Sequence, residues 1–220
     1  MRSAIAWAFS LLLLGTAPLS RAQEPEQPDG LSRLLAGMAA SAGFEGHFVE
    51  EMEVALLREP VRSHGALYYV PPDRLARFTT RPVATALLVD GKRVEFRDAE
   101  GQRTDLSASP LARHFTGNLL LLFAGDREAL EASYAVTLEE RGGAWKLRLV
   151  PRHPPLSQAI AHIALEGRGG RLERMEVLDA EGARTRTQLD HVRSDRHFAA
   201  AELATLFEAG LPLPPPGGPR

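Results

Sequence analysis

The stretch that decides the fold is Phe44-Glu-Gly-His-Phe-Val-Glu-Glu-Met-Glu-Val-Ala-Leu56. Its residues alternate with a period of two, which indicates a β-strand with one face toward water. It is longer than an ordinary strand of about 5–6 residues, so we expect a large antiparallel sheet. What the apolar face covers decides whether the protein is a scaffold or holds an apolar molecule. That face carries Phe44, Gly46, Phe48, Glu50, Met52, Val54 and Leu56, whereas the other carries Glu45, His47, Val49, Glu51, Glu53 and Ala55.

Residues 1–22 have the composition of a signal peptide. Arg2 supplies a positive charge, residues 4–14 form an apolar run, and residues 20–22 (Ser-Arg-Ala) place small side chains before a cut at Gln23. The run is too short to span a membrane, and an uncleaved membrane anchor is the alternative. The chain contains no cysteine, which excludes a lipid-anchored lipoprotein, disulfides and thiolate metal sites. We therefore expect an exported protein of the bacterial periplasm.

The mature chain is predicted to form one domain. Residues 23–28 are polar and contain proline, which predicts a flexible N-terminus, and residues 29–209 are long enough for one domain with a core. Residues 210–220 are rich in proline and glycine and are expected to be disordered. The formal net charge is −2, with basic and acidic residues interspersed. These features argue against nucleic acid as a partner and against an electrostatic membrane anchor.

Helical and strand patterns follow one another along the domain. An apolar stripe at helical spacing predicts a helix over residues 31–42, with Asp29 as its N-cap and Gly43 as its stop. Asp90-Gly91 joins two β-rich runs, which is the preferred chemistry of a type I′ hairpin. Further strands are expected at residues 66–70, 75–80, 84–89, 92–98, 134–140, 144–150, 160–166, 171–179 and 183–192, and helical segments at 106–124, 126–133 and 203–209.

About ten strands at regular spacing indicate a barrel or a sandwich. One antiparallel sheet that curls around two amphipathic helices accounts for the strands and the helices together. The segment at residues 111–123 is apolar around most of its circumference. It is therefore either part of the core or a lid over a lipid pocket.

The sequence contains no specific catalytic motif: there is no nucleophile elbow, phosphate-binding loop, zinc-protease motif or dinucleotide fingerprint. We therefore expect no enzyme activity, no cofactor and no metal site. The seven histidines are scattered, which favours surface or hydrogen-bonded roles, but a spatial cluster with Asp or Glu stays open. They are His47, His64, His114, His153, His162, His191 and His197.

Glu50 is a carboxylate on the apolar face of the opening strand, where an unpaired charge is costly. We expect it to pair with an arginine such as Arg74 or Arg77, or to lie near the rim of the sheet; a ligand-gating role is the alternative. Arg74, Arg77 and Arg81 recur around one short strand. They are either solvated charges or a latch that bonds a lid helix or an anionic head group.

A series of short motifs follows in a characteristic order. The first half contains Phe44-Glu-Gly-His-Phe48 after a helix, Gly65-Ala-Leu-Tyr-Tyr69, Pro72-Asp-Arg-Leu75 and Leu88-Val-Asp-Gly-Lys-Arg-Val94. The second half contains Trp145-Lys-Leu-Arg-Leu-Val-Pro-Arg152, the pair of strands at 171–185, Asp190-His-Val-Arg193 and the segment 198–207. Each motif alone is weak, but in this order they resemble the LolA family of periplasmic carriers of outer-membrane lipoproteins, over about residues 29–207.

This resemblance implies a mainly β fold: an unclosed antiparallel β-barrel of about ten or eleven strands, with helices lidding a hydrophobic cavity. It implies that the cavity takes the acyl part of a lipoprotein from an inner-membrane donor complex to an outer-membrane acceptor, without covalent chemistry. The family carries an arginine directly after the aromatic or aliphatic residue of its third strand. Here Leu75 is followed by Ala76, which suggests a divergent paralogue that serves another lipid or a polyene-lipid pathway.

Two sets of site residues follow from this interpretation. The predicted lid latch consists of Arg74, Arg77 and Glu50. The predicted ligand-binding residues are Phe48, Met52, Leu67, Tyr69, Leu75, Leu88, Val94, Phe96, Leu119, Phe123, Trp145 and Leu147.

Three hypotheses from different classes remain. We favour a monomeric carrier whose cargo is a lipidated protein or a lipid. The second is a non-enzymatic interaction module of the same fold, acting in a polyene-lipid or envelope-assembly pathway. The third is a hydrolase, for which the sequence offers no motif.

Overall fold

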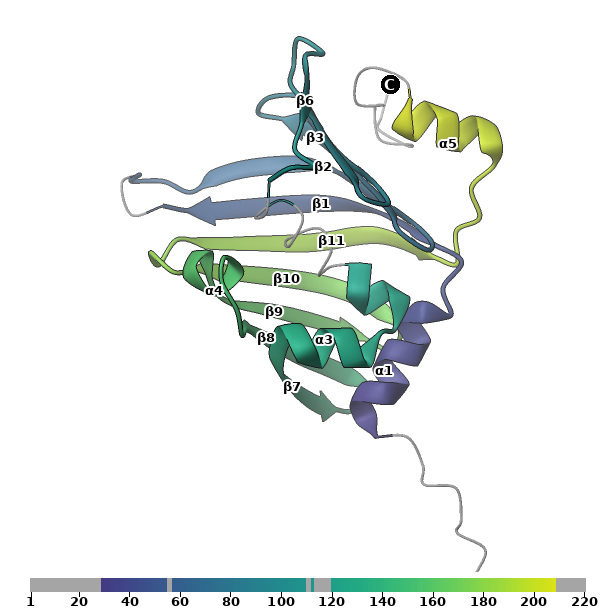
Figure 1. The fold of residues 1–220 in the computed structure, drawn as a ribbon, viewed down its shortest axis with the longest axis vertical. Helices are drawn as coiled ribbons and strands as arrows, with labels where there is room; N and C mark the ends of the chain where they lie inside the picture. Colours follow the sequence, from purple (N-terminus) through teal and green to yellow (C-terminus); the bar gives the residue numbers. More distant parts are fainter. Residues whose placement is uncertain (1–28, 55–56, 110–111, 113–119, 209–220) are drawn as a thin grey trace, which may run out of the picture.

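The computed structural model describes residues 29–54, 57–109, 112 and 120–208. Their strands form one eleven-stranded antiparallel sheet in the order β6-β5-β4-β3-β2-β1-β11-β10-β9-β8-β7 (Figure 1). The strands are β1 (Phe44–Glu53), β2 (Val61–Val70), β3 (Arg74–Arg81), β4 (Thr85–Asp90), β5 (Arg93–Arg97), β6 (Arg103–Asp105), β7 (Tyr134–Arg141), β8 (Ala144–Pro151), β9 (Ile160–Arg168), β10 (Arg171–Asp179) and β11 (Arg184–Ser194). The helices are α1 (Gly30–Ala39), α3 (Arg127–Ser133), α4 (Leu156–Ala159) and α5 (Ala200–Phe207).

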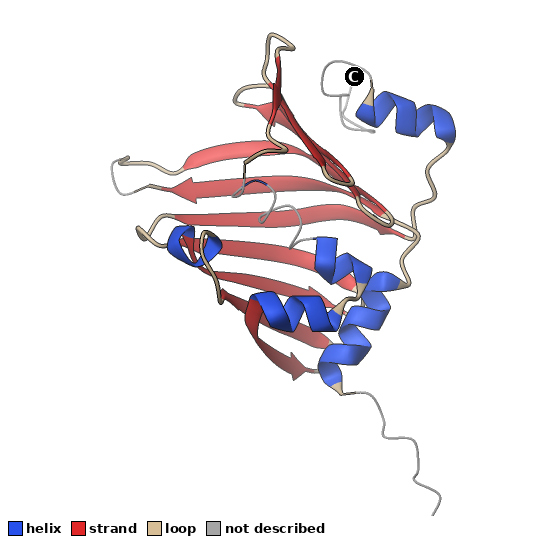
Figure 2. Cartoon of the chain, viewed as in Figure 1, coloured by secondary structure: helices blue, strands red, loops and turns tan. Residues whose placement is uncertain are grey.

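The sheet is a meander that continues through the pairing of its first strand with its last, β1 with β11. The strands β6 and β7 are its two edges, so the curled sheet is not closed into a barrel (Figure 2). This confirms the expected mainly β, unclosed antiparallel architecture. The predicted signal peptide, flexible N-terminus and C-terminal tail lie outside the described residues, and those boundaries stay predictions.

The opening strand ends earlier than its alternation predicts. β1 stops at Glu53 because its neighbours stop there: Glu53 pairs with Arg184, the first residue of β11, and β2 begins at Val61, opposite Met52. Ala55 and Leu56 lie outside the described residues. The sequence did not predict β6 or α4, because three or four residues are too few to reveal a period.

The first helix has the predicted cap and apolar stripe. Asp29 accepts a hydrogen bond from the Ser32 backbone N–H at 2.9 Å, and Leu31, Leu34, Leu35 and Met38 are buried. The helix ends at Ala39, three residues before the predicted end. Gly43 adopts a φ of +140°, and a Cβ there would lie 2.8 Å from the backbone oxygens of Tyr69 and Arg196. Only glycine fits at this close approach, where the chain enters β1.

The curl gives the sheet an inner and an outer face with separate apolar clusters. On the inner face, α1, α3, α4 and the helical residues 120–124 pack against one continuous cluster (Figure 1). On the outer face, α5 covers a smaller cluster over β2, β3 and β4. Strand alternation therefore assigns each side chain of β2–β4 to one of two different environments.

Arginines fasten α5 to the outer face. Arg97, which is buried, donates to the Phe207 backbone oxygen at 2.8 Å, and Arg196 pairs with both Glu45 and Glu202. Burial favours a raised pKa for the neighbouring Glu95, but the hydrogen bond from Arg97 and the nearby arginine charges hold its pKa below the ordinary value. The carboxylate therefore stays charged and orients Arg97 toward the helix.

Within the part of the chain that the structure describes, no helix is long and apolar enough to cross a membrane.

Candidate functional site

The inner face of the curled sheet brings residues from both halves of the chain into one apolar cluster. Eight of the predicted ligand-binding residues belong to it, although they come from five strands and a helix. They are Phe48, Leu67, Tyr69, Leu75, Val94, Phe123, Trp145 and Leu147. Their shared face is an observation, whereas their role in binding stays a prediction.

An aromatic group joins the middle helical segment to the sheet. The ring of Phe123 stacks on that of Tyr69, with the ring centroids 4.6 Å apart, and is tilted against Phe44 at 5.0 Å. Tyr69 is 1% exposed, so this contact excludes water. The described end of the segment therefore packs directly on β1 and β2 through these aromatic side chains.

A charged group interrupts the apolar inner face. One carboxylate oxygen of Glu50 lies 2.7 Å from the Arg77 guanidinium, and the other accepts from the Thr187 hydroxyl at 2.9 Å. The guanidinium carbon of Arg77 lies 4.4 Å from the centre of the Phe48 ring. The predicted pairing of Glu50 is confirmed, with Arg77 as its partner. The group ties β1 to β3 and β11.

Arg74 does not belong to this group, which corrects the predicted latch. It lies on the outer face, where it pairs with Asp90 at 2.7 Å and stands over the Phe207 ring. Adjacent residues of a strand face opposite ways, so Arg74 and Arg77 cannot share a face. Ala76 also faces outward and is fully buried in the cluster under α5. Of these positions in β3, Arg77 is the cation on the inner face.

Leu88 was predicted to bind the ligand with the inner-face residues, and the structure corrects this placement. It lies in the outer cluster with Leu206 of α5, because it pairs with Ala76 across β3 and β4. The inner-face residue of that strand pair is Val89, beside Leu75.

The remaining predicted residues lie at the margin of the cluster or beyond the described chain. Phe96 is half-buried, and Met52 is 39% exposed near the end of β1. Leu119 lies outside the described residues.

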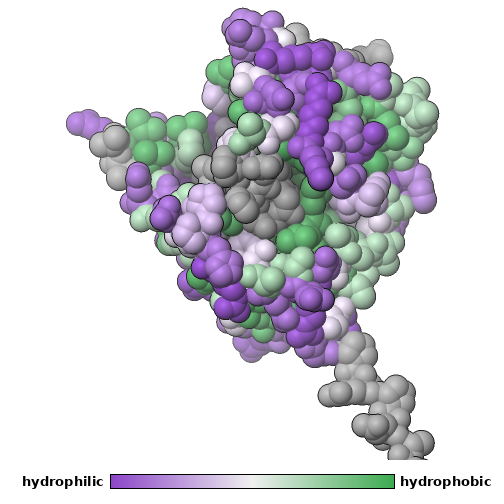
Figure 3. All heavy atoms as spheres, viewed as in Figure 1, coloured by the Kyte–Doolittle hydropathy of each residue, from purple (hydrophilic) through white to green (hydrophobic). Residues whose placement is uncertain are grey.

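Exposed apolar side chains gather where the strands of the first half turn. Met52, Leu57 and Val83 are 39%, 51% and 56% exposed. The β1–β2 connection comes shortly before His64, and the β3–β4 turn comes directly after Arg81. Because His64 and Arg81 are paired across β2 and β3, the connection and the turn lie at the same end of the sheet. An apolar patch is visible in Figure 3 near the left tip, where β1 and β2 end in Figure 1. We call this margin of the inner face the open end.

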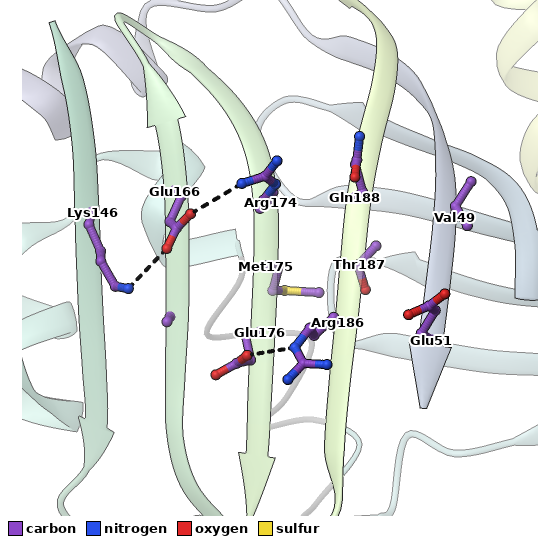
Figure 4. Close-up of a pocket in the computed structure, with 11 residues that line it drawn as sticks. Val49, Glu51, Lys146, Glu166, Arg174, Met175, Glu176, Arg186, Thr187 and Gln188 are labelled. Atoms are coloured by element: carbon purple, nitrogen blue, oxygen red, sulfur yellow. Dashed lines mark hydrogen bonds and ion pairs between the residues drawn. The ribbon is translucent and has the colours of Figure 1, made fainter. Parts of the chain in front are cut away.

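The outer face carries a charged groove of about 440 Å³ across β8, β9, β10, β11 and β1 (Figure 4). Its charges are paired across the strands: Lys146 lies 3.0 Å from Glu166, and Arg186 lies 3.1 Å from Glu176. Burial, followed by the charge of Arg148, lowers the pKa of the adjoining His162. The imidazole is therefore neutral at pH 7 and adds no charge. The groove is therefore lined by a row of ion pairs between neighbouring strands. The polar residues that alternate along these strands are the sequence signal for this row.

Comparison with known proteins assigns this architecture to a family. Residues 23–208 match the family described as outer membrane lipoprotein carrier protein LolA-like. The chain belongs to this LolA-like family. The family supports a role in carrying lipoproteins or lipids, and the resemblance found in the sequence is confirmed.

The similar proteins include curated relatives from two strains of Pseudomonas syringae, pathovars tomato and syringae, each named outer-membrane lipoprotein carrier protein. Both are 25% identical over 124 residues, which are 56% of this chain and 58% of the relative. The match therefore spans just over half the length of these relatives.

Solved structures with a similar fold include a DUF1329 family protein from Desulfovibrio piger, with a TM-score of 0.48 and 11% identity, covering 81% of this chain and 95% of the other. A LolA superfamily protein from Nitrosomonas europaea has a TM-score of 0.44 and 10% identity, with 80% and 96% covered.

Proposed function

We propose that the protein is a periplasmic carrier that binds the acyl part of a lipoprotein, or another lipid, on its inner face. It takes this cargo from an inner-membrane donor complex and moves it toward an acceptor at the outer membrane, as a monomer and without enzymatic chemistry. Membership of the LolA-like family supports the class of cargo. The proposal adds the compartment, the direction of transport and the binding face.

The observation that carries the proposal is how the inner face is covered. Among the described residues, separate short helices and no second sheet lie on it, and the described end of the middle segment rests there through the Phe123–Tyr69 stack. Such a helix can be displaced without breaking sheet hydrogen bonds. An acyl chain that takes its place gains about 0.8 kcal/mol for each buried CH₂.

The open end is the proposed entry route for the acyl chain of the cargo. Met52 is partly exposed on the inner-face side of β1. The next inner-face position away from the open end is Glu50, two residues before Met52. Its ion pair with Arg77 lies beside the Phe48 ring. In the proposed complex the acyl chain lies against Phe48 and Tyr69, and its polar head stays near this ion pair.

The test uses two variants matched for exposure. Met52→Glu places a charge on the inner face at the open end, whereas Val150→Glu places one on the outer face of β8. The two side chains are 39% and 36% exposed, so both variants are expected to fold. Binding of a fluorescent acyl probe should weaken at least tenfold in Met52→Glu and stay unchanged in Val150→Glu. Equal binding by both variants would overturn the inner-face proposal.

Two further measurements separate the other classes. Mass spectrometry of an organic extract of the purified protein should find an acylated molecule in the native chain and less of it in Met52→Glu. Ester hydrolysis that persists in Met52→Glu would favour a hydrolase. A protein partner captured equally well before and after removal of lipid, with no acyl probe bound, would favour an interaction module.

A further inference from the structure

Two histidines and an aspartate converge on the outer face, on the side of the sheet opposite the proposed acyl-binding face. His47 of β1 lies opposite Asp190 of β11, and His191 follows Asp190. One ligand atom from each residue lies within 4.8 Å of those from the other two. The His191 Nδ1 is 3.0 Å from a carboxylate oxygen of Asp190, and the two imidazole centres are 5.5 Å apart.

A β-bulge brings the second imidazole to the first. Between two paired positions, β1 advances from Glu45 to His47 while β11 runs from Arg193 back to Asp190, so β11 contains one extra residue. His191 has a φ of +49°, a left-handed conformation that few residues other than glycine adopt. In a regular strand His191 would face away from Asp190. The bulge instead turns both side chains toward His47.

The donor set suits a divalent transition cation. Two imidazole nitrogens and one carboxylate oxygen are ligands that Zn²⁺ takes at about 2.0–2.2 Å. Tetrahedral coordination needs ligand atoms about 3.3 Å apart, as those bond lengths require. The side chain of His191 is 79% exposed, so it has the rotational freedom to close the difference from 4.8 Å. Asp190 and His191 also line an open groove of about 210 Å³, which leaves a fourth position accessible to water.

We propose that His47, Asp190 and His191 form a binding site for a divalent transition cation, with Zn²⁺ as the reference ion. The cation joins β1 to β11, the only pairing in the described sheet between strands distant in sequence. Its binding therefore stabilises the junction between the two halves of the sheet. The site is independent of the proposed carrier function, because its ligands face away from the acyl-binding face.

The test is a titration of the untagged full chain, freed of metal with a chelator, against Zn²⁺ in isothermal calorimetry. One equivalent should bind, and the midpoint of thermal unfolding should rise with zinc concentration. His47→Gln and His191→Asn should each weaken binding by more than about tenfold, the loss that even outer-shell partners of metal ligands cause. Asparagine tolerates a positive φ, so His191→Asn keeps the bulge. His153→Asn removes an exposed histidine elsewhere and is the matched control.

Each outcome of the zinc titration either supports the proposed site or overturns it. Loss of binding in the two cluster variants, with His153→Asn unchanged and all three proteins unfolding cooperatively without zinc, supports the site. Absence of zinc binding by the native chain overturns it, as do variants that bind like the native chain. Zinc-dependent dimerisation in sedimentation velocity would assign the ligands to two molecules and would also overturn it.

Discussion

The ring of Phe48 lies against the bare backbone of Gly65, its partner across β1 and β2. A Cβ at Gly65 would lie 2.6 Å from two carbons of that ring and 1.9 Å from the Phe78 backbone oxygen. Trp145 and Gly167 repeat the arrangement across β8 and β9, where the added Cβ would lie 2.4 Å from the indole. Each half of the inner face thus seats one large ring where the partner strand has no side chain.

The first prediction concerns this contact. Gly65→Ala should lower the free energy of unfolding by about 1–3 kcal/mol, because the ring and the β3 backbone must move apart. Gly37→Ala is the matched control, since a Cβ at that exposed helical position meets nothing within 4 Å. It should raise stability by about 0.5–1 kcal/mol. Urea unfolding measures both, and a Gly65→Ala protein as stable as the native chain would contradict the packing.

The second prediction concerns the ion pair on the inner face. Arg77→Met should lower the free energy of unfolding by about 1–2 kcal/mol, because Glu50 keeps a largely buried charge without its partner. Adding Glu50→Gln should recover part of this loss in a double-mutant cycle. Arg62→Met, which removes the partner of Glu51 in an exposed pair, should cost no more than about 0.5 kcal/mol. Equal losses in the two arginine variants would show that burial does not matter here.

The third prediction rests on the proposed function. Phe123→Ala should destabilise the protein by about 3–5 kcal/mol but strengthen binding of the acyl probe, because the ring no longer occupies the surface of Tyr69. Phe78→Ala deletes a buried ring from the outer-face cluster and is the control. It should destabilise comparably and leave probe binding unchanged. Weaker binding by Phe123→Ala would mean that the Phe123 ring contacts the bound acyl chain and does not compete with it for the surface of Tyr69.

The fourth prediction concerns acid. The Ser32 backbone N–H, followed by the Arg127 guanidinium, lowers the pKa of Asp29 from 3.8 to about 2. A carboxyl with a depressed pKa stabilises the fold above its unfolded value, and the contribution is lost as the pH falls through the folded pKa. The stability difference between the native chain and Asp29→Asn should therefore be constant above about pH 5 and shrink between about pH 4 and 2. Carboxyl NMR titration measures the pKa itself, and a value near 3.8 would contradict the cap and the Arg127 contact.

Much of the architecture could be predicted because its signals are local. Alternation with a period of two revealed the strands, and helical spacing with Asp29 revealed α1. The charge of Glu50 on an apolar face was enough to predict a cationic partner. The early end of β1 could not be predicted, since it depends on where β2 and β11 begin.

Candidate site residues were harder to predict, because alternation within one strand does not say which face is the inner one. Leu88 and Arg74 belong to apolar and basic patterns that fit either face. Antiparallel register with Ala76 and Asp90 places both under α5 on the outer face.

By itself, the sequence determined most of the elements, their order and the alternating faces of the longer strands, because backbone periodicity and turn chemistry act over a few residues. Only the tertiary structure decided which faces point inward, that Arg77 and not Arg74 meets Glu50, and that His47 lies beside His191. The inward faces and the Arg77–Glu50 pair depend on the register of neighbouring strands, whereas the two histidines meet through the pairing of β1 with β11 and a bulge at that junction. No local pattern specifies contacts between strands at opposite ends of the chain.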